Sequence, residues 1–282
     1  MSLFIKINAL KPSLSNSEAK LAQYTLNQPE MIRHQSSIEL AAAAGVSQSS
    51  VVKFSQKLGY KGFPEFKFGV VDALNSAPKQ ELTTCSEFSA NDSLMSMASK
   101  FGMKLHSVMD HTLELNNEKA IESCAKAFKG AKRLLFVAQG SSSITAKEAI
   151  FKLQKLGIPA QCETDLVAAA NALSLLNKDD VLIIVSHSAQ LKSFQKLAVL
   201  AKEANIKLIT VTKYATNNLS QIADHALFSV QPQEPIPHGG ILTSYSQSFI
   251  LDLVIMTLSL HQQSTIKKAA TANRYIEVLT LE

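Results

Sequence analysis

From residue 133 onward, short and almost continuously apolar runs alternate with longer segments whose apolar residues recur at helical spacing. A run such as Val181–Ser186 has no polar face, which is typical of a strand buried on both sides in a parallel sheet. The pattern therefore predicts an α/β fold with a doubly wound parallel sheet. Strands are predicted at 133–139, 159–162, 181–186, 207–212 and 225–229, and helices at 143–156, 166–175, 192–204 and 243–260.

The first quarter of the chain shows helical spacing only. A helix is predicted over 37–44, followed by Gly45 in a left-handed turn and by a second helix over 48–58 that Ser47 caps. Two helices joined by so tight a turn are typical of a helix-turn-helix, with a plain helical hairpin as the alternative. The apolar residues spaced to face one core are Leu40, Ala44, Val46, Val51 and Phe54.

These two patterns predict two domains. An all-α domain is expected over 1–76 and an α/β domain over 93–282. Residues 77–92 are polar and lose all periodicity, so they are predicted to be a linker. The second domain is expected to open with helices over 93–130, in which Leu94, Met97 and the other methionines are predicted to be core residues.

The start of the helix over 48–58 is polar in a way that suits DNA. Amide and hydroxyl side chains read base edges in the major groove, while lysines bind phosphates. A solvated helix face is the alternative interpretation of the lysines. The candidate DNA-binding residues are Ser47, Gln48, Ser49, Ser50, Lys53, Lys57 and Lys61.

Two hydroxyl-rich loops follow predicted strands in the second domain. Both would lie at the carboxyl ends of the strands, where α/β sheets bind ligands, and helix N-termini there favour an anion such as phosphate. Neither loop contains Lys or Arg, so binding would rest on hydrogen bonds and helix ends; ordinary loops with capping serines are the alternative. The candidate ligand-binding residues are Gly140, Ser141, Ser142, Ser143, Ser186, Ser188 and Gln190, with Glu163 at the expected pocket edge.

Charge and cysteine usage add a few constraints. The 282-residue chain has a net charge of +5, and its first 75 residues contain eight Lys or Arg against five Asp or Glu, which favours an anionic partner for the first domain. Three cysteines without CxxC spacing suit a reducing cytosol and give no reason to expect a disulfide framework, a metal site or a cofactor. The apolar segment 249–260 contains Asp252 and is too short for a membrane span, so a cytoplasmic protein is expected.

The segment GVSQSSVVKFSQKLGYKGFPEFK, residues 45–67, resembles the amino-terminal domain of the RpiR family of bacterial transcriptional regulators. The second half resembles the SIS (sugar isomerase) domain of that family, which has a flavodoxin-like sheet. The resemblance implies a homodimer or higher homo-oligomer that binds operator DNA and responds to a sugar phosphate. It is nearest to regulators of the N-acetylmuramic acid 6-phosphate type, so the expected effector is an N-acetylated hexosamine 6-phosphate and the expected action is repression of sugar or amino-sugar catabolism.

The chain departs from the SIS loop patterns at several positions. Ala138 and Ala189 replace glycines, Leu191 replaces a threonine, and Ser244 stands where related regulators carry arginine. Two alternatives therefore stay open: an SIS domain that only dimerises, and an enzyme of the sugar-phosphate isomerase or lyase type. The enzyme would need a positioned base, for which the candidates are His187, His238 and Glu163.

Overall fold

The computed structural model describes residues 3–76, 88–215, 217–230, 240–260 and 263–280. The chain divides into two compact units, Met1–Met103 and Lys104–Glu282, and the division falls inside a single long helix, α7 (Leu94–Leu115). Most of the predicted linker lies outside the described residues, as does His238.

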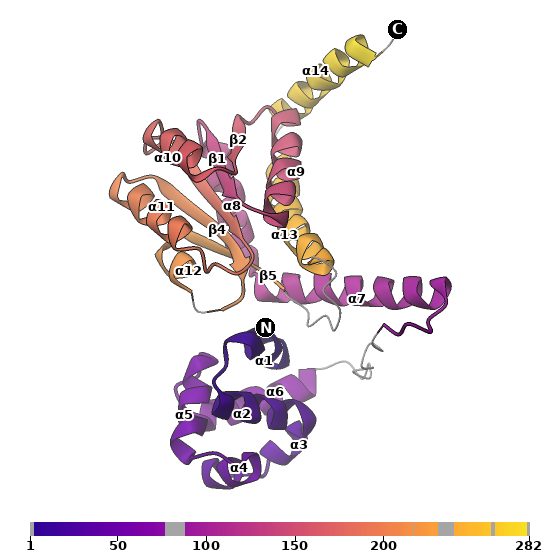
Figure 1. Ribbon diagram of the computed structural model, residues 1–282, viewed down its shortest axis with the longest axis vertical. Helices are drawn as coiled ribbons and strands as arrows, with labels where there is room; N and C mark the ends of the chain where they lie inside the picture. Colours follow the sequence, from indigo (N-terminus) through magenta and orange to yellow (C-terminus); the bar gives the residue numbers. More distant parts are fainter. Residues whose placement is uncertain (1–2, 77–87, 216, 231–239, 261–262, 281–282) are drawn as a thin grey trace. The chain divides into compact units, whose positions relative to one another are not determined.

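The first unit is helical, as predicted, and α1 is an addition that the sequence pattern did not indicate (Figure 1). Capping boxes start two of its helices, because Ser15 pairs with Glu18 and Ser36 pairs with Glu39. The elements before α7 are α1 (Leu3–Leu10), the 3-10 helix η1 (Lys11–Ser13), α2 (Asn16–Asn27), α3 (Pro29–Ile32), α4 (Ser37–Ala44), α5 (Gln48–Lys57) and α6 (Phe63–Ser76).

The turn between α4 and α5 has the expected geometry. Gly45 adopts φ 64° and ψ 46°, a left-handed conformation that suits glycine. The backbone N–H of Val46 returns to the carbonyl of Ala41 at 2.9 Å and closes the end of α4. The rings of Phe54 and Phe66 meet edge to face with centroids 5.8 Å apart, so α5 is fixed on α6.

The second unit is built on a five-stranded parallel sheet in the order β2-β1-β3-β4-β5, which confirms the predicted fold class. One core cluster joins a face of the sheet to α8, α9 and α13, and the other joins the opposite face to α10, α11 and α12 (Figure 1). The strands are β1 (Leu134–Ala138), β2 (Ala160–Glu163), β3 (Val181–Ser186), β4 (Lys207–Lys213) and β5 (His225–Ser229). The helices after α7 are α8 (Glu118–Gly130), α9 (Ser141–Lys155), α10 (Leu166–Ser174), α11 (Lys192–Glu203), α12 (Asn218–Ile222), α13 (Ile241–Leu260) and α14 (Gln263–Thr280).

The first half of α7 contradicts the prediction that Leu94 and Met97 are core residues. The side chains of Leu94 and Met97 are 74% and 44% exposed, and Met95 is 77% exposed. The segment is a helix, as its spacing predicts, but within the described residues the buried positions of α7 begin only at Val108. Leu94, Met95 and Met97 therefore face solvent, whereas Phe101 and Leu105 are half-buried.

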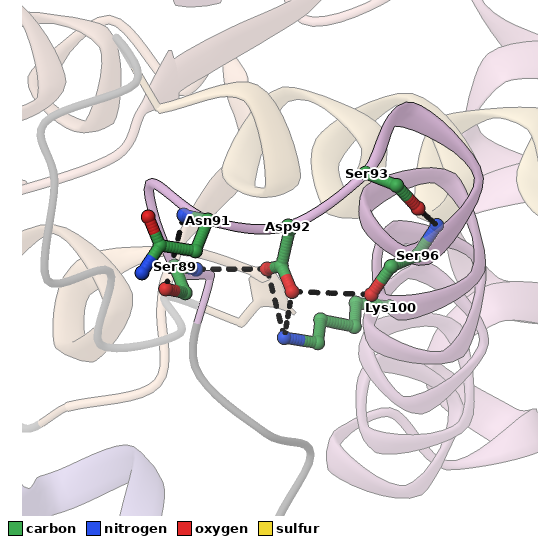
Figure 2. Close-up of polar contacts among 6 residues, drawn as sticks. All are labelled: Ser89, Asn91, Asp92, Ser93, Ser96 and Lys100. Atoms are coloured by element: carbon green, nitrogen blue, oxygen red, sulfur yellow. Dashed lines mark hydrogen bonds and ion pairs between the residues drawn. The ribbon is translucent and has the colours of Figure 1, made fainter.

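A polar cluster fixes the chain as it enters α7 (Figure 2). The Lys100 ammonium donates to both carboxylate oxygens of Asp92 at 2.7 and 2.8 Å, and the backbone N–H of Ser89 donates to the same group at 2.8 Å. The Lys100 hydrogen bond holds the pKa of Asp92 below its usual range. Because Asp92 precedes the helix and Lys100 lies within it, the pair ties the incoming chain to the second turn of α7.

The second half of α7 is fastened to the sheet domain by buried hydroxyl groups. The Thr112 and Ser246 oxygens lie 2.6 Å apart, and both residues are fully buried. The N–H of Val230 donates to the Ser246 hydroxyl at 2.8 Å, while the Thr112 hydroxyl donates to its own helix at the carbonyl of Val108. These groups form one ordered chain of hydrogen bonds from the end of β5 through α13 to α7.

Helix α13 is the core helix of the second unit. It begins two residues before the predicted start, and by length and composition it is apolar enough to cross a membrane. Half of that apolar window is buried inside the unit, and the helix packs against α8, α9 and β5. Its apolar character is therefore explained by packing inside the domain.

We predict that the hydrogen bond that the Ser246 hydroxyl donates to the Thr112 hydroxyl contributes to the stability of the second unit. Thr112→Val should lower the free energy of unfolding by about 1–3 kcal/mol, because it leaves a buried hydroxyl without its partner. Thr257→Val on α13 is the control, since among the described residues the Thr257 hydroxyl bonds only to the Leu253 carbonyl of its own helix, whereas Thr112 also bonds to Ser246 on another helix. Urea unfolding followed by circular dichroism measures both variants, and equal losses would contradict the assigned role of the inter-helix bond.

Candidate functional site

Two separate groups of predicted site residues are found, one in each unit. The first lies at the start of α5. The Ser47 hydroxyl caps the helix by accepting the N–H of Ser50 at 3.3 Å, and it lies 2.9 Å from the hydroxyls of Ser49 and Ser50. The Gln48 amide donates to the Ser37 hydroxyl of α4 at 2.9 Å. The start of α5 therefore presents a compact, largely exposed polar surface.

The three candidate lysines differ in their surroundings. Lys53 and Lys61 are exposed. The Lys57 ammonium is instead engaged inside the unit, where it donates to the Glu18 carboxylate at 2.8 Å and to the Ser13 carbonyl at 2.9 Å. Partial burial raises the pKa of Glu18, but hydrogen bonds from Lys57 and Ser15 outweigh this effect and hold the pKa below its usual value. Lys57 thus joins α5 to α2.

The second group lies at the carboxyl edge of the sheet between β1 and β3. These strands are neighbours, with Ala138 paired to Val185, so the loops that follow them start side by side. The helix after β1 packs on one face of the sheet and the helix after β3 packs on the other. A sheet whose connections diverge in this way leaves a crevice at the divergence, which is where such folds bind ligands.

The first loop leads directly into α9. Gly140 adopts φ 60° and ψ −141°, a backbone conformation that glycine reaches without strain. The helix starts at Ser141, two residues earlier than predicted, so the three serines form its first turn. Ser141 is exposed, whereas Ser142 is buried and donates its hydroxyl hydrogen to Oε1 of Gln247 at 3.2 Å. The Ser143 hydroxyl donates to the Gly140 carbonyl at 2.7 Å.

The second loop contains Ala189 in a left-handed backbone conformation. Its φ of 56° explains why related sequences place glycine there, since a left-handed conformation costs an alanine about 1–2 kcal/mol. Ala189 is 1% exposed and belongs to the core cluster that contains Phe194. The Ser188 hydroxyl accepts the N–H of Gln190 at 3.3 Å, and Ser186 ends β3.

Lys213 is a residue that the loop analysis missed. It is the last residue of β4, and its backbone N–H donates to the carbonyl of His187 at 3.0 Å, so it borders the second loop. The sequence contains a usable signal, because Lys213 directly follows the predicted strand 207–212 and must therefore lie at the carboxyl edge of the sheet. Glu163 lies at the same edge at the end of β2, with β1 between it and β3.

The described cysteines are free and poorly reactive. Burial raises the pKa of the Cys124 thiol to about 12, and burial also raises the pKa of the half-buried Cys162 thiol. A thiol with a raised pKa is a poor nucleophile and a poor metal ligand. Within the described residues, no three His, Cys, Asp or Glu side chains are grouped so as to hold a metal ion.

A helix-turn-helix domain joined to an α/β domain with hydroxyl-rich loops at the carboxyl edge of its sheet is typical of a two-domain transcriptional regulator. The helix-turn-helix domain of the rpiR family matches residues 1–77, and the SIS domain matches residues 127–257. The chain belongs to the RpiR family of helix-turn-helix transcriptional regulators with an SIS domain.

Whole-length relatives agree with this assignment. An uncharacterized HTH-type transcriptional regulator of Escherichia coli (strain K12), YfhH, is 31% identical over 259 residues, which is 92% of this chain and 92% of that protein. An uncharacterized HTH-type transcriptional regulator of Haemophilus influenzae is 28% identical and covers 90% of this chain and 88% of its own length.

Solved structures show the same fold. The NanR protein of Vibrio vulnificus, complexed with ManNAc-6P, matches with a TM-score of 0.62 at 18% identity, over 99% of this chain and 100% of that chain. The sugar isomerase domain of an RpiR transcription factor from Sphaerobacter thermophilus matches with a TM-score of 0.57 at 20% identity, over 64% of this chain and 98% of that chain.

The different surroundings of Lys53 and Lys57 lead to a prediction about DNA binding. Lys53→Ala should weaken binding to specific and random DNA alike and reduce the log–log salt dependence by about 0.9 per lost phosphate contact. Lys57→Ala should leave the salt dependence unchanged and lower the thermal stability of the first unit, because it removes the partner of Glu18. Fluorescence anisotropy at several salt concentrations, with thermal unfolding as the control, measures both effects. An equal change of slope in both variants would contradict this division of roles.

Proposed function

We propose that this regulator binds a sugar phosphate at the β1–β3 edge and that the bound ligand changes its affinity for operator DNA. The observation that carries the proposal is the meeting of two hydroxyl-rich loops at neighbouring strand ends, one of them at the N-terminus of the 15-residue helix α9. Backbone N–H groups at a helix start attract an anion, and hydrogen bonds to an ionised phosphate are roughly twice as strong as neutral ones.

Each candidate ligand residue has a role in this proposal. Gly140 lets the backbone approach the phosphate, while the hydroxyls of Ser141, Ser142 and Ser188 are the proposed donors from the two loops. Lys213 supplies the positive charge that both loops lack. Ser186, Gln190 and Glu163 are proposed to contact the rest of the ligand, and Ser143 to shape the first turn.

We infer an N-acetylated hexosamine 6-phosphate as the effector class. The support is the likeness of fold to NanR, whose structure contains ManNAc-6P. The acetamido group offers one donor and one acceptor, which suits the amide of Gln190 and the carboxylate of Glu163 at the crevice edge. The chain would then act in the cytoplasm as a repressor of sugar or amino-sugar catabolism.

On the DNA side, α5 is the proposed recognition helix. Gln48, Ser49 and Ser50 are proposed to read base edges, and Lys53 and Lys61 to bind phosphates. Reading a pseudo-palindromic operator requires two copies of α5, so a homodimer or a higher homo-oligomer is part of the proposal. We further propose that the SIS domain binds its sugar phosphate without converting it, as expected of a chain whose full-length relatives are named regulators.

Footprinting on the promoter region of its own gene tests the DNA part of the proposal. Two protected half-sites are expected, separated by about one helical turn or a multiple of it, because two recognition helices must enter the major groove on one face of the duplex. A single unpaired footprint, or no protection at low salt, would overturn this part. Gln48→Ala should narrow the difference between operator and random DNA without removing non-specific binding.

Calorimetry with N-acetylated hexosamine 6-phosphates tests the ligand part. Ser188→Ala and Ser142→Ala should each reduce the binding free energy by about 1–3 kcal/mol. Ser174→Ala is the matched control, because Ser174 is an exposed serine at the far end of α10 and should bind as wild type. The unphosphorylated sugars should bind much more weakly. Equal affinity for phosphorylated and unphosphorylated sugars would refute the phosphate assignment.

A further inference from the structure

Gln247 is a buried amide beside the first ligand loop. It lies on α13, is 1% exposed, and its Oε1 accepts the hydroxyl hydrogen of Ser142 at 3.2 Å. Its Nε2 is buried and has no hydrogen-bond partner among the described residues. Buried amide groups are rarely left in this state, so the two free N–H bonds require a physical explanation.

The hydrogen bond of Ser142 conflicts with phosphate binding. A serine hydroxyl carries a single hydrogen, and here that hydrogen points to Gln247. A phosphate dianion offers only acceptors, so it needs the same hydrogen. Ser142 therefore cannot donate to the ligand while it donates to the Gln247 carbonyl.

We propose that Gln247 is a positioning residue whose terminal amide turns over when the ligand binds. After the half-turn, Nε2 donates to the Ser142 oxygen, and the Ser142 hydroxyl donates its hydrogen to the phosphate. The two ends of a glutamine amide have nearly the same shape, so the exchange needs no repacking of the buried surroundings. It also gives the unpaired Nε2 a hydrogen-bond partner. The amide oxygen then has none, but a buried carbonyl oxygen without a hydrogen bond is tolerated better than a buried N–H without one.

The anion itself favours the turned orientation. The NH2 end of the amide carries partial positive charge, and the turn brings that end toward the phosphate. The N–H donor of Gln247 also polarises the Ser142 hydroxyl, and chains of hydrogen bonds strengthen one another at low local dielectric. A neutral sugar supplies neither the charge nor the dianionic acceptor, so Gln247 makes the site selective for the phosphorylated form.

This inference rests on the proposed phosphate site, so the experiment separates the two. The probes are ManNAc 6-phosphate and inorganic phosphate, titrated by calorimetry into the full-length wild type, Ser142→Ala, Gln247→Met and the double variant. Gln247→Met keeps the buried length and removes the donor, and it should weaken binding about tenfold. In the Ser142→Ala background the same change should have almost no further effect, because Gln247 acts through Ser142.

Gln247→Glu gives a readout that a purely structural role would not produce. At pH 7.5 a carboxylate can only accept from Ser142 and repels the anion, so affinity should fall more than tenfold below wild type. As the pH falls and the carboxyl gains a hydrogen, it becomes a donor, and the ratio of wild-type to variant affinity should shrink. Circular dichroism confirms folding of each variant, and Gln247→Met keeps the test decisive if Gln247→Glu does not fold.

Three results would overturn the inference. Loss of binding in Ser142→Ala with unchanged binding in both Gln247 variants would refute the role of Gln247 and leave the proposed function intact. Equal losses from Gln247→Met in both backgrounds would show that Gln247 does not act through Ser142. Absence of binding by the wild type would refute the phosphate site itself and the inference with it.

Discussion

The proposed ligand site depends on one constraint: the connections that follow the neighbouring strands β1 and β3 run to opposite faces of the sheet. All five strands run parallel, so every connection must cross over a face of the sheet with a helix. The connection after β1 runs to α9 on one face of the sheet, and the connection after β3 runs to α11 on the other face. Between β1 and β3 these connections separate, so the first turn of α9 and the loop after Ser186 lie at the edge where folds of this kind bind ligands. The fully apolar interiors of the two strands hold these loops in fixed register.

Most of the fold could be predicted from the sequence because it rests on local periodicity. Strands β3 and β5 have the predicted bounds, and the cap at Ser47 and the turn at Gly45 could be predicted from residue type alone. The exact start of α9 was not, since three serines in a row give no apolar signal by which to place a helix end. The exposed start of α7 was misread for a related reason: apolar spacing shows which face is apolar and gives no information on whether anything covers it.

The parts of the site that sequence analysis missed depend on contacts between distant residues. Ser142 and Gln247 are 105 positions apart, and Thr112 and Ser246 are 134 apart. No local pattern pairs such residues. Within the mostly apolar α13, Ser246 and Gln247 read as minor interruptions of a core helix. Only the folded chain shows that these neighbouring polar residues bond to different elements, one to α7 and one to α9.

This arrangement makes α13 more than a core helix. A ligand changes DNA affinity only if it binds two states of the protein with different affinity, so a regulator needs an element with two discrete arrangements. Side chains in a close-packed core rarely have a second arrangement without strain, because neighbouring atoms fill the space. A buried glutamine amide is an exception, since its half-turn exchanges donor and acceptor at almost constant volume. Gln247 has this property and bonds to Ser142 in the first turn of α9, and the adjacent Ser246 bonds to α7, the helix that contains the boundary between the two compact units. The polar pair on α13 therefore bonds at one end to the first turn of α9 and at the other to α7.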